Sequence, residues 1–135
     1  MSHIIRRALP GGLALAVLAA APAFAHHGTA ASYVQDRWIT VSGVVTEFRW
    51  RNPHCSLFLD VTDESGKVVS YAIELASPGL MVRRNGWRRD TFEPGDEVVF
   101  KVHPSRTGAP VGECLFGCEV LINGEKAPTL EDAAE

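Results

Sequence analysis

The sequence predicts an all-β domain, an OB-like five-stranded partly open Greek-key barrel with one short helix. Segments in which apolar and polar residues alternate follow the order strand, strand, strand, short helix, strand, strand. The first strand also changes its buried face near Gly43, as a strand that bends at a barrel corner must. A small β-sandwich is the alternative fold, but an immunoglobulin-like sandwich needs about seven strands.

Residues 1–25 have the charged, apolar and A-x-A order of a secretory signal peptide. The apolar run, Leu13 to Ala21, is shorter than the roughly 20 residues of a membrane span. We therefore expect cleavage before His26 and a periplasmic or secreted protein that spans no membrane. The remaining chain of about 110 residues suits one domain. It divides into a lead over 26–38, the barrel over 39–126 and an acidic tail over 127–135.

The charge of the mature chain argues against nucleic acid as a partner. Loss of Arg6 and Arg7 takes the formal net charge from −3 to −5, whereas nucleic-acid binders carry clustered Lys and Arg. One basic cluster interrupts this acidic chain, and it is interpreted either as a solvated helix face and turn or as an anion site. Its members are Arg83, Arg84, Arg88 and Arg89.

The first strand runs through W-I-T-V-S-G-V-V-T-E-F-R-W. Ile39 and Val41 share one face by period-two alternation, whereas Val44, Phe48 and Trp50 share the other. We therefore expect the bend or bulge near Gly43 and an inward side chain at Val44.

The second and third strands form a hairpin around the turn D-E-S-G, with Gly66 in the left-handed position. When residues are paired outward from the turn, every pair on the inward face is apolar or nearly so. A shift of the register by one residue would exchange the two faces, so the hydrophobic pattern rejects it. The expected pairs are Val61 with Val69, Leu59 with Tyr71, Leu57 with Ile73 and Cys55 with Leu75.

A short helix follows, with Ser77 as N-cap, Pro78 in its first position and Gly86 just beyond its end. Trp87 is expected to fold back onto it. The fourth strand is E-V-V-F-K-V-H, and the last is C-L-F-G-C-E-V-L-I, which ends at N-G.

Three cysteines leave at least one unpaired within a monomer in an oxidising compartment. On a straight strand Cys114 and Cys118 lie roughly 13 Å apart, beyond the roughly 7 Å Cα limit for a disulfide. They can pair only if Gly117 breaks the strand, and Cys55 is the alternative partner for either.

Strand parity gathers a polar group on the outer face of the barrel: Arg49, Arg51, His54 and Glu74. Trp50, Asn52 and Pro53 lead into His54, and the proline fixes the turn. One interpretation is that His54 and Glu74 bind a ligand or metal ion, with Arg49, Trp50 and Asn52 beside them. The other is that Glu74 pairs with Arg49 across the strands and His54 caps the turn.

Cleavage after Ala25 predicts a second feature, a free N-terminal histidine. The α-amine and imidazole of His26 form a chelate that suits Cu(II), and His27 adds another imidazole. His54 or His103 is expected to supply a further nitrogen, and copper is the expected cofactor. The alternative is that the cut leaves a mobile His-His end with weak, purposeless metal binding.

The chain resembles a family of small exported bacterial proteins of unknown function. The resemblance rests on H-H-G after the signal peptide, then G-V-V-T-E-F-R-W-R-N-P-H, E-L-A-S-P, R-R-N-G-W and P-G-D-E-V. It implies an exported single domain and no established reaction, and the three cysteines lie outside its pattern. A similarity to periplasmic copper-binding sandwiches stops at His26 and His27.

The leading hypothesis is a non-enzymatic exported protein that binds a metal ion or small ligand through His26, His27 and His54. The alternative is an accessory subunit for an exported enzyme or membrane complex, with Phe58 and the Arg83–Arg89 surface as contacts to an exported partner. An enzyme comes third, because no G-x-S-x-G motif or nucleophile-histidine pair is found.

Overall fold

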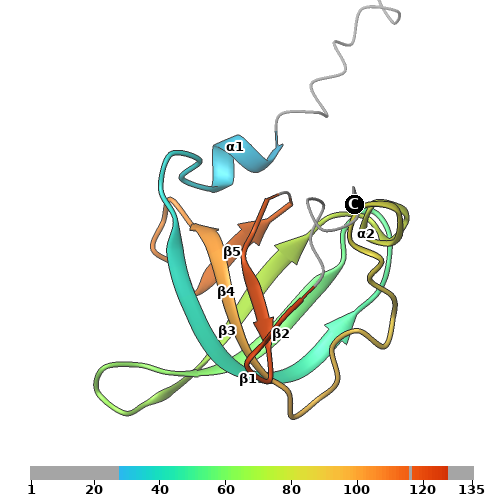
Figure 1. Cartoon of the computed structure of the whole chain (residues 1–135). Coiled ribbons are helices and arrows are strands. Elements are labelled where there is room, and N and C mark those ends of the chain that lie inside the picture. Colours follow the sequence, from blue (N-terminus) through green and yellow to red (C-terminus); the bar gives the residue numbers. More distant parts are fainter. Residues whose placement is uncertain (1–27, 116, 128–135) are drawn as a thin grey trace, which may run out of the picture.

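The computed structural model describes residues 28–115 and 117–127. Five strands form a closed mixed barrel in the order β1-β2-β3-β5-β4, and pairing of β4 with β1 closes it. Two further strands, β6 and β7, extend the sheet from β4 outside the barrel (Figure 1). The elements are α1 Gly28–Ser32, β1 Ile39–Arg49, β2 Ser56–Thr62, β3 Val68–Leu75, α2 Pro78–Asn85, β4 Glu97–Pro104, β5 Val111–Cys114, β6 Val120–Ile122 and β7 Glu125–Lys126.

The OB-like barrel predicted from the sequence is confirmed, with a parallel pair between β3 and β5 and antiparallel pairs elsewhere. The short helix α1 at the start of the described chain adds to the one helix expected. Neither described helix has the length and hydropathy needed to cross a membrane. The predicted signal peptide, His26, His27 and most of the predicted tail fall in residues 1–27 and 128–135, which lie outside the described residues.

Strand β1 bends as expected, but at a different residue. Its first half pairs with β4 and its second half with β2, and the register shifts between Val45 and Glu47. Val45 is therefore buried and Val44 is 42% exposed, so the prediction that Val44 points inward is wrong. Gly43 has another role, because a Cβ there would lie 2.6 Å from the Asp60 carbonyl oxygen of β2. The glycine permits a close approach of two backbones.

The β2–β3 hairpin has the predicted register. Leu57 pairs with Ile73, Leu59 with Tyr71 and Val61 with Val69. Asp63 Oδ1 accepts the backbone N–H groups of Ser65 and Lys67 at 2.9 and 3.0 Å and fixes the turn, in which Gly66 has a φ of 82°. The hairpin tip projects from the barrel on the side away from α2 (Figure 1).

Helix α2 covers one end of the barrel. It begins at Pro78 and ends before Gly86, whose left-handed φ of 68° and N–H bond to the Val82 carbonyl match the predicted C-cap. Trp87 folds back into the core at 2% exposure and contacts Phe92 and Phe100 edge to face. Met81 is the buried residue of the helix.

The predicted last strand is two strands. β5 ends at Cys114 and β6 begins at Val120, with Gly117 at a φ of 67° between them. This break brings Cys114 and Cys118 to a Cα–Cα distance of 5.8 Å, and they form a disulfide. Cys55 is free and buried, and burial raises the pKa of its thiol, which disfavours the reactive thiolate.

The interior of the barrel leaves no room for a side chain at position 112 of β5. A Cβ on Gly112 would lie 2.6 Å from Val102 Cγ2 and 3.1 Å from the Tyr71 hydroxyl oxygen. We expect Gly112→Ala to lower the free energy of unfolding by about 1–3 kcal/mol through overpacking. Urea denaturation measures it, with Gly79→Ala as the control, because a Cβ there meets only Arg83 Nη1 at 3.5 Å. Equal stability of the two variants would contradict the packing argument.

Candidate functional site

A row of polar residues crosses the outer face of the barrel over four adjacent strands. Glu74 of β3 pairs with Ser56 of β2 on one side and Glu113 of β5 on the other. Glu113 in turn lies opposite His103 of β4. Because Ile73 and its neighbours on alternate positions are buried in the core, these four side chains lie on the opposite face. We call Ser56, Glu74, Glu113 and His103 the polar row.

The described part of the N-terminal lead is attached to this row through three of its residues. The Tyr33 hydroxyl donates to Glu74 Oε2 at 2.8 Å, and Gln35 Nε2 donates to Glu113 Oε2 at 2.7 Å. His103 Nδ1 lies 2.9 Å from the Arg37 carbonyl oxygen, which accepts its proton. The lead is therefore part of the site, although the sequence predicted it only as a segment before the first strand.

The structure brings His54 and Glu74 together. His54 Nδ1 lies 2.5 Å from Glu74 Oε1, an ion-pair distance without the angles of a regular hydrogen bond. The imidazole follows the Asn52–Pro53 turn, whose peptide bond is cis, and its side chain is 36% exposed. Glu74 thus holds His54 with one oxygen and Tyr33 with the other.

Tyr33 stays a hydrogen-bond donor in this arrangement. Burial raises the pKa of its phenol most, followed by its hydrogen bond to Glu74 and the negative charges of Glu74 and Glu113. The residue is 7% exposed. A neutral hydroxyl that is kept protonated is suited to fixing a carboxylate in one orientation.

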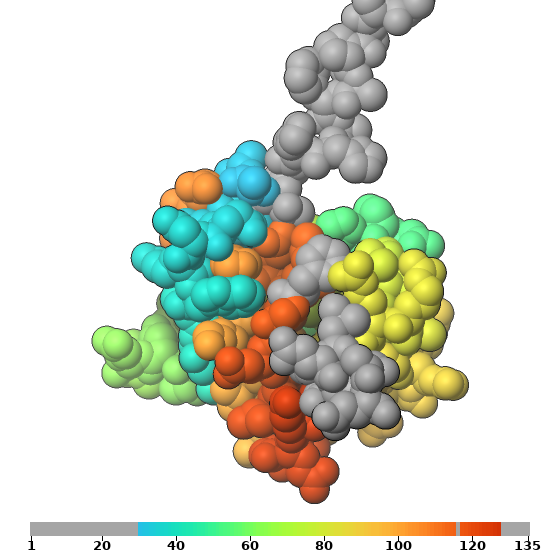
Figure 2. All heavy atoms as spheres, turned by 45° about the horizontal axis from the view of Figure 1, so that its top comes forward, coloured from blue at the N-terminus to red at the C-terminus, as the bar shows by residue number. Residues whose placement is uncertain are grey.

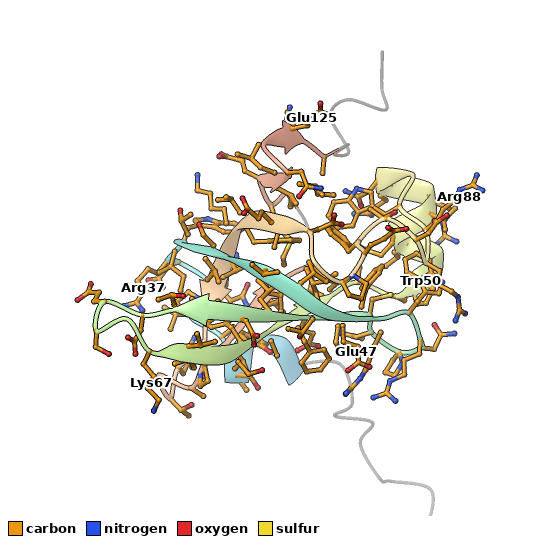
Figure 3. The ribbon with its side chains drawn as sticks, turned by 90° about the horizontal axis from the view of Figure 1, so that it is seen from below. Arg37, Glu47, Trp50, Lys67, Arg88 and Glu125 are labelled. Carbon is orange, nitrogen blue, oxygen red and sulfur yellow. A yellow bond between two sulfur atoms is a disulfide. The ribbon has the colours of Figure 1, made fainter. Side chains whose placement is uncertain are left out.

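The other predicted site residues lie apart from this contact. Arg49 forms a bidentate pair with Glu47 at 2.6 and 2.8 Å and stacks over Phe58 at 4.3 Å, in place of the expected pair with Glu74. Trp50 packs edge to face against Phe48 and borders the core, while Asn52 is exposed. Figure 3 shows Trp50 at the same end of the molecule as Arg88, with Lys67 at the opposite end.

Glu113 is the residue that sequence reasoning missed. It is 2% exposed, and within the described residues its Oε1 atom has no hydrogen-bond partner. A buried carboxylate oxygen without a donor destabilises a fold by a few kcal/mol. The available signal was its position directly before Cys114, which places it on the outer face of the last barrel strand.

The barrel alone does not form a complete metal site. In residues 28–115 and 117–127, no three His, Cys, Asp or Glu side chains converge to hold an ion. His54 offers one imidazole, and His103 is turned to the Arg37 carbonyl and stacks on Trp38 at 3.7 Å between ring centroids.

Replacement of the Glu113 carboxylate tests how much this buried group lowers the free energy of unfolding. We expect Glu113→Gln to raise the free energy of unfolding by about 1–3 kcal/mol, because the amide keeps the size of the side chain without a buried charge. Thermal and urea unfolding measure the change. Glu119→Gln is the matched control: its side chain is 77% exposed beside Lys101, so stability should change by less than about 0.5 kcal/mol. A destabilised Glu113→Gln protein would show that the charge is compensated.

Comparisons with known proteins identify a family of unknown function and give no activity. A search of the curated proteins finds no match. The model of a family of unknown function, DUF6152, matches residues 14–114. Since this match spans most of the chain, including β1 to β5 of the barrel, the protein belongs to the DUF6152 family.

Proposed function

We propose that the protein is exported and binds a transition-metal ion, with Cu(II) as the expected ion, through His54 and the terminal histidines His26 and His27. The observation that carries the proposal is the chain of contacts from Tyr33 through Glu74 to His54. We assign no catalytic step to this protein. A role as accessory subunit with an exported partner stays a prediction.

The contact with Glu74 prepares His54 as a ligand. Metal-binding imidazoles usually direct their second ring nitrogen to a carboxylate, which fixes the tautomer and raises the basicity of the ligating nitrogen. With Nδ1 at the Glu74 carboxylate, Nε2 is the atom left to bind an ion. The half-exposed ring is accessible to one.

The lead supplies a short connection between the terminal histidines and this ring. Tyr33, which donates to Glu74, directly follows α1, a helix of five residues and about 7.5 Å in length. His27 precedes the first residue of that helix in the sequence. This short tether supports the binding of one ion by the terminal histidines and His54 together.

The ligand chemistry favours copper among the common divalent ions. An α-amine and two or three imidazoles are nitrogen ligands, for which Cu(II) has the highest affinity in the first-row series. The negative charges of Glu74 and Glu113 on the same face favour a cation. Because the described residues contain no complete metal-binding group, the proposed site depends on the terminal nitrogens.

Calorimetric titration with CuCl₂ of protein that begins at His26 tests the proposal. We expect His54→Ala and Glu74→Gln to weaken the affinity by about 10-fold or more, since second-shell changes cost roughly 10–100-fold. Acetylation of the α-amine of His26 should weaken it as strongly, because the acetylated nitrogen is an amide and no longer chelates with the imidazole.

His103→Ala is the control on the same face, and its affinity should stay within about twofold of the unchanged protein. Equal affinity in the His54→Ala, Glu74→Gln and unchanged proteins would reject His54 as a ligand. Equal affinity with and without the acetyl group would reject the terminal chelate.

A further inference from the structure

The two ends of the barrel differ in how they are filled. Met81, Trp87 and Phe92 close the end beneath α2. At the opposite end, beside the β2–β3 turn, a pocket of about 340 Å³ opens between the hairpin, the start of β1 and the loop before β5. Barrel mouths of this size are common small-molecule sites, which range from about 300 to 1,000 Å³.

The walls of this mouth are mainly apolar. They include inward-facing residues of β1, β2 and β3, together with prolines at the end of β4 and in the loop. The lining shows the character of a hydrophobic ligand pocket, and burial of an apolar chain there is favourable. Its principal apolar members are Ile39, Val61, Val69, Pro104, Ala109 and Pro110.

One neutral donor lies within the lining. Tyr71 faces inward opposite Leu59, and burial raises the pKa of its phenol, so its hydroxyl keeps its proton. Within the described residues no acceptor takes this proton in a hydrogen bond. Gly112 lets the backbone of β5 lie close to this hydroxyl, since a Cβ there would be only 3.1 Å from the oxygen. A ligand oxygen would satisfy this donor.

The lining of the pocket holds one arginine and one aspartate. Arg37 belongs to the lining, is exposed, and forms no ion pair with another described residue. Asp63 also belongs to the lining, but its Oδ1 already accepts from the backbone of Ser65 and Lys67 and from the Ser65 hydroxyl. Figure 3 shows Arg37 and Lys67 at the same end of the molecule. Arg37 is therefore the cation of the lining that is left to pair with a carboxylate.

We infer that this mouth binds a small amphipathic monocarboxylate, such as a short-chain fatty acid. The apolar chain packs in the mouth, Arg37 pairs with the carboxylate, and Tyr71 donates to a carboxylate oxygen. None of His54, Glu74 and Tyr33 lines the pocket, so this site is separate from the proposed metal site. The space-filling view in Figure 2 places the hairpin with its turn on the opposite flank from α2.

Titration of the full mature chain with three probes of equal chain length tests the headgroup. Hexanoate, hexanol and hexylamine are added to metal-free protein, and binding is followed by amide chemical shifts. We expect hexanoate to bind at least about 10-fold more tightly than hexylamine, with hexanol between them. No saturable binding by any probe, or hexylamine binding as tightly as hexanoate, would overturn the inference.

Substitutions locate the site. Arg37→Gln should reduce the hexanoate affinity to that of hexanol, whereas Arg89→Gln, which removes the same charge near α2, should leave it unchanged. Tyr71→Phe should weaken hexanoate by about 2- to 10-fold. Ala109→Trp, at an exposed loop position that lines the pocket, should block all three probes. Unchanged hexanoate binding in both Arg37→Gln and Ala109→Trp would place the ligand elsewhere and refute the proposed pocket.

Discussion

The closed barrel depends on β1, whose pairing with β4 as well as β2 closes the ring. β1 binds β4 along its first half and β2 along its second half, and the register shift after Val45 lets one continuous strand turn from one partner to the other. Gly43 lets the backbone of β1 lie close against β2, because a side chain there would clash with the Asp60 carbonyl oxygen. Once β1 is paired on both edges, its partners follow in register, and alternation along each strand decides which side chains point into the barrel.

That alternation accounts for the candidate site. Once Ile73 and Leu75 point inward, Glu74 must point outward beside Glu113 on the parallel strand. Two neighbouring carboxylates would repel each other on a bare sheet face. The lead offsets this by bringing a hydroxyl from Tyr33 and an amide from Gln35, one for each carboxylate. The outer face is thus polar, largely covered and attached to the chain that leads to the N-terminus.

Much of this architecture could be predicted from local patterns. The β2–β3 register follows from alternation and turn length, and the ends of α2 follow from Pro78 and Gly86, because both signals lie within a few residues. The position of the β1 bulge could not be predicted, since the alternation permits either Val44 or Val45 inside and only pairing with two strands decides. For the site, parity predicted the approach of His54 to Glu74. It could not reveal that Tyr33 and Glu113 both lie beside Glu74, because the lead and β5 are distant from β3 in the sequence.

The disulfide between Cys114 and Cys118 has a local character that follows from its short span. A bridge with a sequence separation of four restricts the unfolded chain far less than one that closes a long loop. It joins the end of β5 to the segment just before β6, and no described barrel pairing involves a residue between the two cysteines. Reduction should therefore loosen the corner that carries β6 and β7 while the five-stranded ring, whose remaining cysteine is an unpaired thiol sealed in the interior, keeps its shape in reducing and oxidising surroundings alike.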